Sequence, residues 1–207
     1  MNRKFLIIII AVIVLGGAVF FLFNKKFPQT AQVSNSINEY PSVSDNIDDT
    51  YTITPSEDNK ENNLYIDSQY KFSFEYPKHF TATKFSEGES GNTILVQYRE
   101  QSEQVSTSIN KYPKGASFQI FIAPFDEPGP LTKERVLEDL PDLIIKNPEQ
   151  RVLKNGEVAL MFFSQESSIG ETREIWFIHN GFLYQISTYK ELDSLVAKIL
   201  ETWKFQE

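Results

Sequence analysis

The two histidines are the first residues to consider for metal or acid–base chemistry. Glu75 precedes His79 by one helical turn, the spacing that places two metal ligands on one face of a helix. Pro77 lies between them, and proline is incompatible with a helix interior. His179 is far away in the sequence. We therefore expect His79 in a loop and His179 at a strand end, without a metal site at either.

Carboxylates gather in three short clusters that could act as acid–base pairs or as calcium ligands. None of them has the Asp-x-Asp-x-Asp-Gly spacing of a calcium-binding loop, so we expect solvated surface at each. The clusters are Asp126–Glu127, Glu138–Asp139–Asp142, and Glu166 with Glu171 and Glu174.

The sequence also lacks the motifs of an activated serine nucleophile and of a phosphate-binding loop. Ser167 and Ser168 precede Gly170 but do not form Gly-x-Ser-x-Gly, and no glycine-rich phosphate loop occurs. The chain has no cysteine, which excludes disulfides, thiolate metal sites and a cysteine nucleophile. We therefore predict a protein that is not an enzyme and has no cofactor. A carboxylate-based enzyme is the alternative.

A partner-binding site is predicted where an aromatic residue meets an acidic loop. Phe125 follows Pro124 at the end of an expected strand, and Asp126 and Glu127 then lead into Pro128-Gly129-Pro130. Exposed loops on a rigid scaffold often carry binding residues, and aromatic side chains are frequent anchors at interfaces. The sequence thus predicts partner contact through Phe125, Asp126 and Glu127, whereas the other aromatic residues are expected in the core.

The N-terminal residues 1–26 predict a single transmembrane anchor. No charged or strongly polar side chain occurs from Phe5 to Phe23, and about 19 residues in a helix approach the hydrocarbon thickness of a bilayer. Arg3, Lys4 and the α-amino group precede this stretch and Lys25 and Lys26 follow it, a small charge asymmetry that favours a cytoplasmic N-terminus. A cleaved signal peptide is the alternative. We predict a single-pass protein of the cell membrane with its C-terminal domain extracytoplasmic.

Residues 27–63 are rich in Ser, Asn, Asp, Thr, Glu and Pro, a composition typical of a disordered linker. The isolated Tyr40, Ile47, Tyr51 and Ile53 could form transient contacts or one docking strand, but they are too few to build a core. Residues 64–207 are expected to form the folded domain. The whole chain has a formal net charge of −8, and four basic residues lie within residues 1–26, so the remainder is more acidic still. An acidic surface repels phosphate backbones, and we predict no nucleic-acid binding.

The folded domain is predicted to be α+β, with an antiparallel sheet flanked by helices. Phe72, Phe74 and Tyr76 alternate with polar residues, as in a strand with one buried face. Asn-Gly pairs predict two-residue hairpin turns. The expected strands are 70–77, 93–98, 117–123, 151–153, 158–164, 174–178 and 182–188, with turns at Asn155-Gly156 and Asn180-Gly181. The expected helices are 132–140 and 192–203, the second of which is clearly amphipathic.

The segments that open and close this domain resemble the PsbP-like family. The opening strand reads Tyr70-Lys71-Phe72-Ser73-Phe74-Glu75-Tyr76-Pro77, and the end reads Ile199-Leu200-Glu201-Thr202-Trp203-Lys204-Phe205. The resemblance implies an α/β/α sandwich over about residues 64–205. The family includes uncharacterised bacterial surface proteins, and the resemblance supplies no catalytic residues.

Taken together, these features predict a membrane-anchored, extracytoplasmic accessory or binding domain. Its expected partners are the membrane, through the N-terminal helix, and an envelope protein. A structural subunit of a cell-envelope assembly is a further alternative, which extensive exposed apolar surface on the domain would favour.

Overall fold

The computed structural model describes residues 50–56, 61–99, 116–166 and 170–206. The predicted anchor and most of the predicted linker lie outside these residues. In the part of the chain that is described, no helix is long and apolar enough to cross a bilayer.

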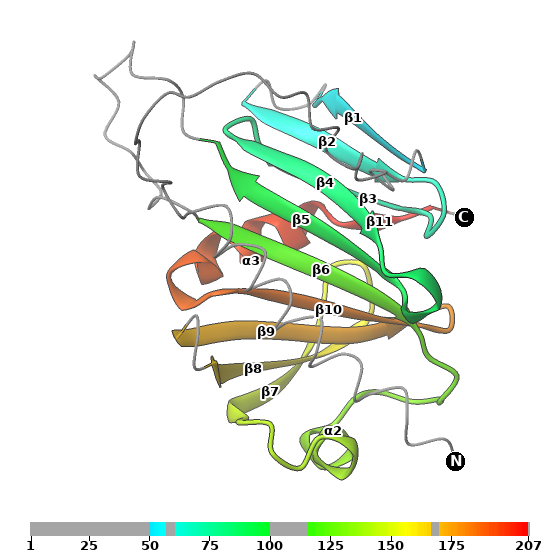
Figure 1. Ribbon diagram of the computed structural model, residues 1–207, viewed down its shortest axis with the longest axis vertical. Coiled ribbons are helices and arrows are strands. Elements are labelled where there is room, and N and C mark those ends of the chain that lie inside the picture. The colour runs from blue at the N-terminus through cyan, green and yellow to red at the C-terminus, as the bar shows by residue number, and fades with distance from the viewer. Residues whose placement is uncertain (1–49, 57–60, 100–115, 167–169, 207) are drawn as a thin grey trace, which may run out of the picture. The chain divides into compact units, whose positions relative to one another are not determined.

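Two antiparallel sheets with few helices make up the described fold, which is compatible with the predicted α+β class (Figure 1). The smaller sheet has four strands in the order β1 (Tyr51–Pro55), β2 (Asn62–Asp67), β3 (Phe72–Pro77) and β11 (Lys204–Phe205). The larger has seven, in the order β4 (Phe80–Ser86), β5 (Asn92–Tyr98), β6 (Ser117–Pro124), β10 (Phe182–Tyr189), β9 (Gly170–His179), β8 (Val158–Glu166) and β7 (Lys146–Val152).

Two α-helices and two short 3-10 helices complete the described structure. Helix α2 spans Lys133–Asp139 and α3 spans Asp193–Thr202, both close to their predicted positions. The 3-10 helices are η1 (Gly88–Ser90) and η2 (Lys190–Leu192). Helix α3 contacts β3 of the smaller sheet and β10 of the larger one, and so lies where the two sheets meet.

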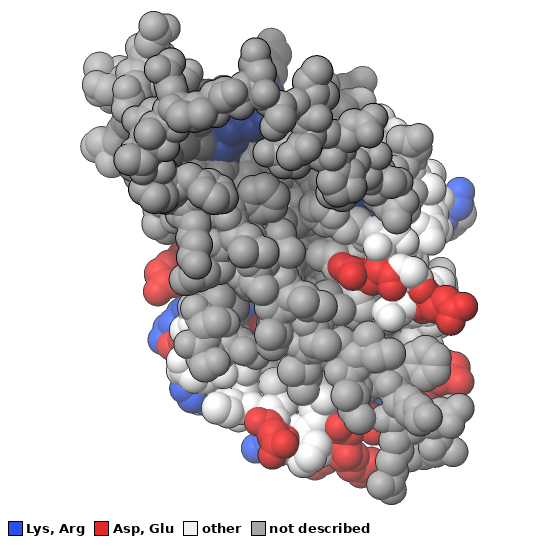
Figure 2. Space-filling view, in the orientation of Figure 1, with Lys and Arg blue, Asp and Glu red and all other residues white. Residues whose placement is uncertain are grey.

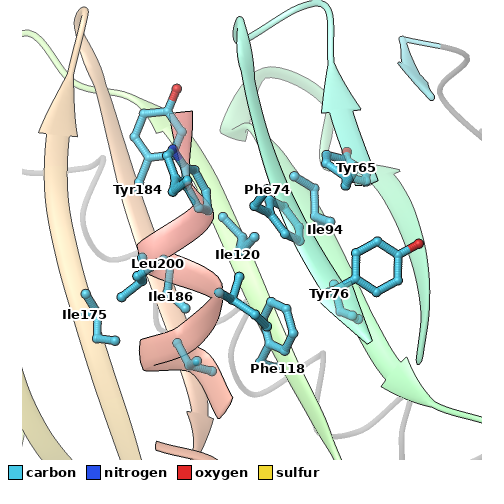
Figure 3. Close-up of a cluster of buried hydrophobic side chains, with 14 of the residues drawn as sticks. Tyr65, Phe74, Tyr76, Ile94, Phe118, Ile120, Ile175, Tyr184, Ile186 and Leu200 are labelled. Atoms are coloured by element: carbon cyan, nitrogen blue, oxygen red, sulfur yellow. The ribbon is translucent and has the colours of Figure 1, made fainter. Parts of the chain in front are cut away.

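The main core lies between the smaller sheet, α3 and one face of the seven-stranded sheet, which we call its inner face (Figure 3). Phe72 and Phe74 of β3 are fully buried there, as the sequence predicts, and both stack on Trp203 with ring centroids 4.5 and 5.3 Å apart. The next residues of the large strands, such as Phe162 and Trp176, are buried on the opposite, outer face. Because strand side chains alternate, the central strands of this sheet carry buried side chains on both faces.

A buried ion pair links the two sheets at the inner face. Asp67, at the end of β2, lies 3.1 Å from Lys84 of β4, and both side chains are completely buried. The Lys84 ammonium also donates to Thr50 Oγ1 and Gln69 Oε1, at 2.7 and 2.8 Å. Its three donors are therefore all used, which limits the cost of burying its charge.

The folded domain begins earlier than predicted. Strand β1 (Tyr51–Pro55) lies within the segment assigned to the linker, as do the first residues of β2. Strand β1 pairs antiparallel with β2 along its whole length. The partial burial of β1 results from its packing against β2, for example from the stacking of Tyr51 on Tyr65 with ring centroids 5.4 Å apart. Because this contact is made with a residue outside the segment, the local composition gives little sign of a strand.

One of the two predicted hairpin turns is correct and the other is wrong in type. Asn180 and Gly181 both have positive φ, 48° and 78°, and join β9 to β10 as a two-residue turn. Asn155-Gly156 does link β7 to β8, but only Gly156 has positive φ. There the Leu153 N–H donates to Glu157 O, so the loop is longer than two residues. Asn155 instead accepts a hydrogen bond from the Glu157 N–H at 3.1 Å.

Candidate partner-binding surface

The three predicted contact residues lie in the loop that joins β6 to α2, which we call the rim loop (Phe125–Thr132). At its start, the Phe125 N–H donates to Gly181 O at 2.8 Å, which ties the loop to the β9–β10 turn. At its end, Thr132 is the N-cap of α2 and its hydroxyl accepts from the Arg135 N–H at 3.2 Å. Both ends of the rim loop are therefore attached to regular structure.

Arg135 holds the middle of the rim loop together. Its guanidinium donates to Glu127 Oε2 at 2.8 Å and to the carbonyls of Pro128 and Gly129 at 3.1 and 3.2 Å. The same guanidinium lies over the Phe125 ring, 5.1 Å from its centroid. One planar group with five donors thus fixes an aromatic ring, a carboxylate and two backbone carbonyls.

The structure brings the three predicted residues side by side but gives them different surroundings. Phe125 is half-buried beneath Arg135, and Glu127 is 42% exposed while paired with it. Asp126 between them is exposed. Whether these residues contact a partner stays a prediction. Sequence reasoning missed Arg135, and its only local signal is a basic residue in the first turn of a predicted helix.

The surface around the rim loop is acidic. Figure 2 shows acidic side chains along the lower edge of the view, where Figure 1 places α2. Exposed carboxylates occur on α2 and on both of its flanks. They belong to Asp126, Glu134, Glu138 and Asp142. A surface of this charge favours a partner with a basic region.

The third acidic cluster does not come together as a site. Glu171 lies 2.6 Å from Lys190 and 3.8 Å from Lys146, and the hydrogen bond from Lys190 lowers the pKa of its carboxyl. Glu174 is buried on the outer face and accepts hydrogen bonds from Trp176 Nε1 and Ser187 Oγ at 3.1 and 2.5 Å. Among the described residues, no group of three or more histidines and carboxylates could hold a metal ion.

Both histidines lie where the sequence predicts them. His79 is exposed in the turn between β3 and β4. His179 ends β9, and its Nδ1 lies 2.7 Å from Glu157 Oε1. Its ring stacks on Phe205 with centroids 3.5 Å apart. A histidine oriented by a carboxylate is one part of several catalytic arrangements, which also require a nucleophile or a bound substrate group.

Searches with protein-family models and against curated proteins found no match to this chain. The resemblance to the PsbP-like family therefore stays a prediction, carried by the residues of β3 and by the end of α3.

Proposed function

We propose that the chain is a membrane-anchored, extracytoplasmic accessory domain that binds an envelope protein through the rim loop and the acidic surface of α2. The apolar stretch in residues 5–23 supports the anchor, and the small excess of positive charge before it over Lys25 and Lys26 after it supports the orientation. We further propose the PsbP-like α/β/α arrangement for its folded part, supported by the antiparallel seven-stranded sheet and by the packing of α3 against its strand β10.

The Arg135 network is the observation that supports binding at the rim loop. A loop that is already fixed loses less conformational freedom when a partner binds. The Arg135 guanidinium forms its hydrogen bonds within the loop, to Glu127 and to backbone carbonyls. Asp126 and the carboxylates of α2 therefore remain as the charges exposed to a partner. The partner is therefore a protein with a basic segment, and it approaches the β6–α2 end of the domain.

The test is cross-linking of the full-length protein in its native membrane, followed by purification and identification of captured proteins. Asp126→Lys reverses an outward charge, and Arg135→Ala releases the loop. We expect both variants to lose at least about three-quarters of the capture of a given partner, since a lost charge contact costs on the order of 1 kcal/mol. Glu201→Lys is the matched control, because Glu201 is exposed on α3 and the charge change is the same.

Equal capture by Asp126→Lys and Glu201→Lys would contradict a site at the rim loop. Phe125→Ala distinguishes whether the Phe125 ring contacts the partner or supports the fold. If Phe125 is a contact, capture falls while the melting temperature stays within a few degrees. A large fall in melting temperature would show instead that its contact with Arg135 supports the fold.

A further inference from the structure

Strand β7 is an edge of the seven-stranded sheet, and it is the strand with the most exposed side chains. It ends the strand order, so among the described strands only β8 pairs with it. Six of its seven residues are exposed. The exposed fraction reaches 61% for the Arg151 side chain and 68% for Val152. An uncovered edge is a template for pairing with another strand.

The hairpin geometry shows which backbone groups of β7 point outward. The Leu153 N–H donates to Glu157 O, and beyond it Val152 is paired with Val158 and Arg151 with Ala159. Bonded and non-bonded pairs alternate along an antiparallel ladder. The N–H and C=O of Arg151 and Glu149 therefore point toward β8, while those of Gln150 and Val152 point away from the sheet.

The charged residues on either side of Gln150 make β7 complementary to an antiparallel copy of itself. Glu149 and Arg151 flank it and share one face of the strand, where they form an ion pair of 3.1 Å. If a second β7 runs antiparallel and the two Gln150 residues face each other, Glu149 of each copy lies opposite Arg151 of the other. Opposite charges directly across two strands stabilise the pairing, and like charges would oppose it.

We propose that two copies of this chain pair through β7, antiparallel and centred on Gln150, to form one continuous sheet. Gln150 of each copy donates to and accepts from Gln150 of the other. In this register Val152 faces Pro148 of the other copy, which has no N–H to donate and lies within the irregular stretch of β7, so the ladder does not extend to that pair. The register shift between Lys146 and Glu149, with Asn147 at φ 49°, ends the pairing there.

Proline, charge and a bulge are also the features by which proteins protect sheet edges. Here they leave Glu149–Val152 regular and allow a single register, so they restrict the pairing to a short segment. Such an interface buries less than the roughly 1,200 Å² of a stable complex, and the dimer is weak in dilute solution. Holding both copies on one membrane raises their effective concentration.

Disulfide cross-linking tests this pairing directly, because the chain has no cysteine of its own. Gln150→Cys in the full-length protein places two thiols on residues whose Cα atoms are about 5.5 Å apart, within disulfide range. Thr52→Cys is the control, on the exposed β1 edge of the smaller sheet. We expect at least about fivefold more disulfide dimer from Gln150→Cys after mild oxidation in membranes. Equal yields would overturn the proposal.

A charge reversal tests the register. Arg151→Glu added to Gln150→Cys puts two carboxylates opposite each other, and we expect the dimer yield to fall at least about fivefold. Lys154→Glu has the same charge change but lies in the exposed hairpin loop outside the strand, and should leave the yield unchanged. Equal yields from the two double variants would rule out this register. Arg151 and Lys154 lie outside the rim loop, but Gln150 Nε2 donates to Leu131 O of that loop at 2.7 Å. Partner capture by Gln150→Cys is therefore measured beside its dimer yield, which keeps failure of this pairing distinct from failure of the rim-loop site.

Discussion

The two faces of the seven-stranded sheet each bury a carboxylate, and the two clusters differ in how completely they are bonded. On the inner face, Asp67 accepts hydrogen bonds from the Tyr65 hydroxyl and from the N–H groups of Gln69 and Tyr70, at 3.0–3.1 Å. With the ion pair to Lys84, both of its oxygens have partners. This cluster is satisfied by the chain itself.

On the outer face, Glu174 is held by Trp176 and Ser187, but polar atoms beside it are not matched. Gln185 lies opposite Trp176 in the ladder and is 2% exposed, and neither atom of its amide has a hydrogen-bond partner among the described residues. The Thr172 hydroxyl, two residues before Glu174, has none either. A buried charged cluster can thus stabilise a fold when all of its groups are hydrogen-bonded. Buried neutral groups without hydrogen-bond partners lower the stability of the fold.

The largest expected effect comes from opening the complete cluster. Lys84→Met removes the cation and leaves the Asp67 carboxylate buried without its charge partner, which costs about 3–5 kcal/mol. The melting temperature should fall by about 10 °C or more in a thermal unfolding experiment. Adding Asp67→Asn removes the unpaired charge and should recover part of the loss. A double variant less stable than Lys84→Met would contradict this account of the pair.

The incomplete cluster should respond in the opposite direction. Gln185→Leu replaces an amide without partners by an apolar side chain of similar size, so we expect the free energy of unfolding to stay equal or rise by up to about 1 kcal/mol. Urea unfolding of both proteins measures it. A loss above about 1 kcal/mol would show that the amide is bonded in solution, for example through a buried water.

The sequence predicted those parts of the fold whose signal is local. Phe72, Phe74 and Tyr76 alternate with polar residues because their strand has one buried face, and all three are buried. The stripe of α3 was read correctly for the same reason, with Leu195 and Ile199 buried. Strand β1 was assigned to the linker, with one docking strand only as an alternative, because its side chains are mostly exposed or half-buried and its strand conformation depends on β2.

For the rim loop and the buried ion pair, too, the sequence predicted only what is local. Phe125, Asp126 and Glu127 are consecutive, so the sequence shows them together, but the role of Arg135 depends on how the loop folds back onto α2. The pairing of Asp67 with Lys84 joins strands of different sheets and leaves no periodic pattern. Contacts between distant segments follow from the complete packing, which local propensity does not determine.

The smallest expected change in stability concerns Glu149, whose ion pairs are partly exposed to solvent, unlike the two buried carboxylates. The hydrogen bond from Arg173, at 2.9 Å, lowers the pKa of Glu149, and the charge of Arg151 adds to this. A carboxyl whose pKa is lower in the folded state stabilises the protein above its unfolded pKa, near 4.3. That contribution is lost as the pH falls through the folded pKa.

Glu149→Gln measures this contribution. The Glu149 side chain is 40% exposed, so solvent screening keeps the loss at pH 7 below about 1 kcal/mol, far less than for Lys84→Met. Thermal unfolding of both proteins between pH 7 and pH 3 should show the difference shrinking toward zero in acid, because protonation removes the same charge from the parent. A difference that stays constant with pH would mean that Glu149 acts through packing and not through its charge.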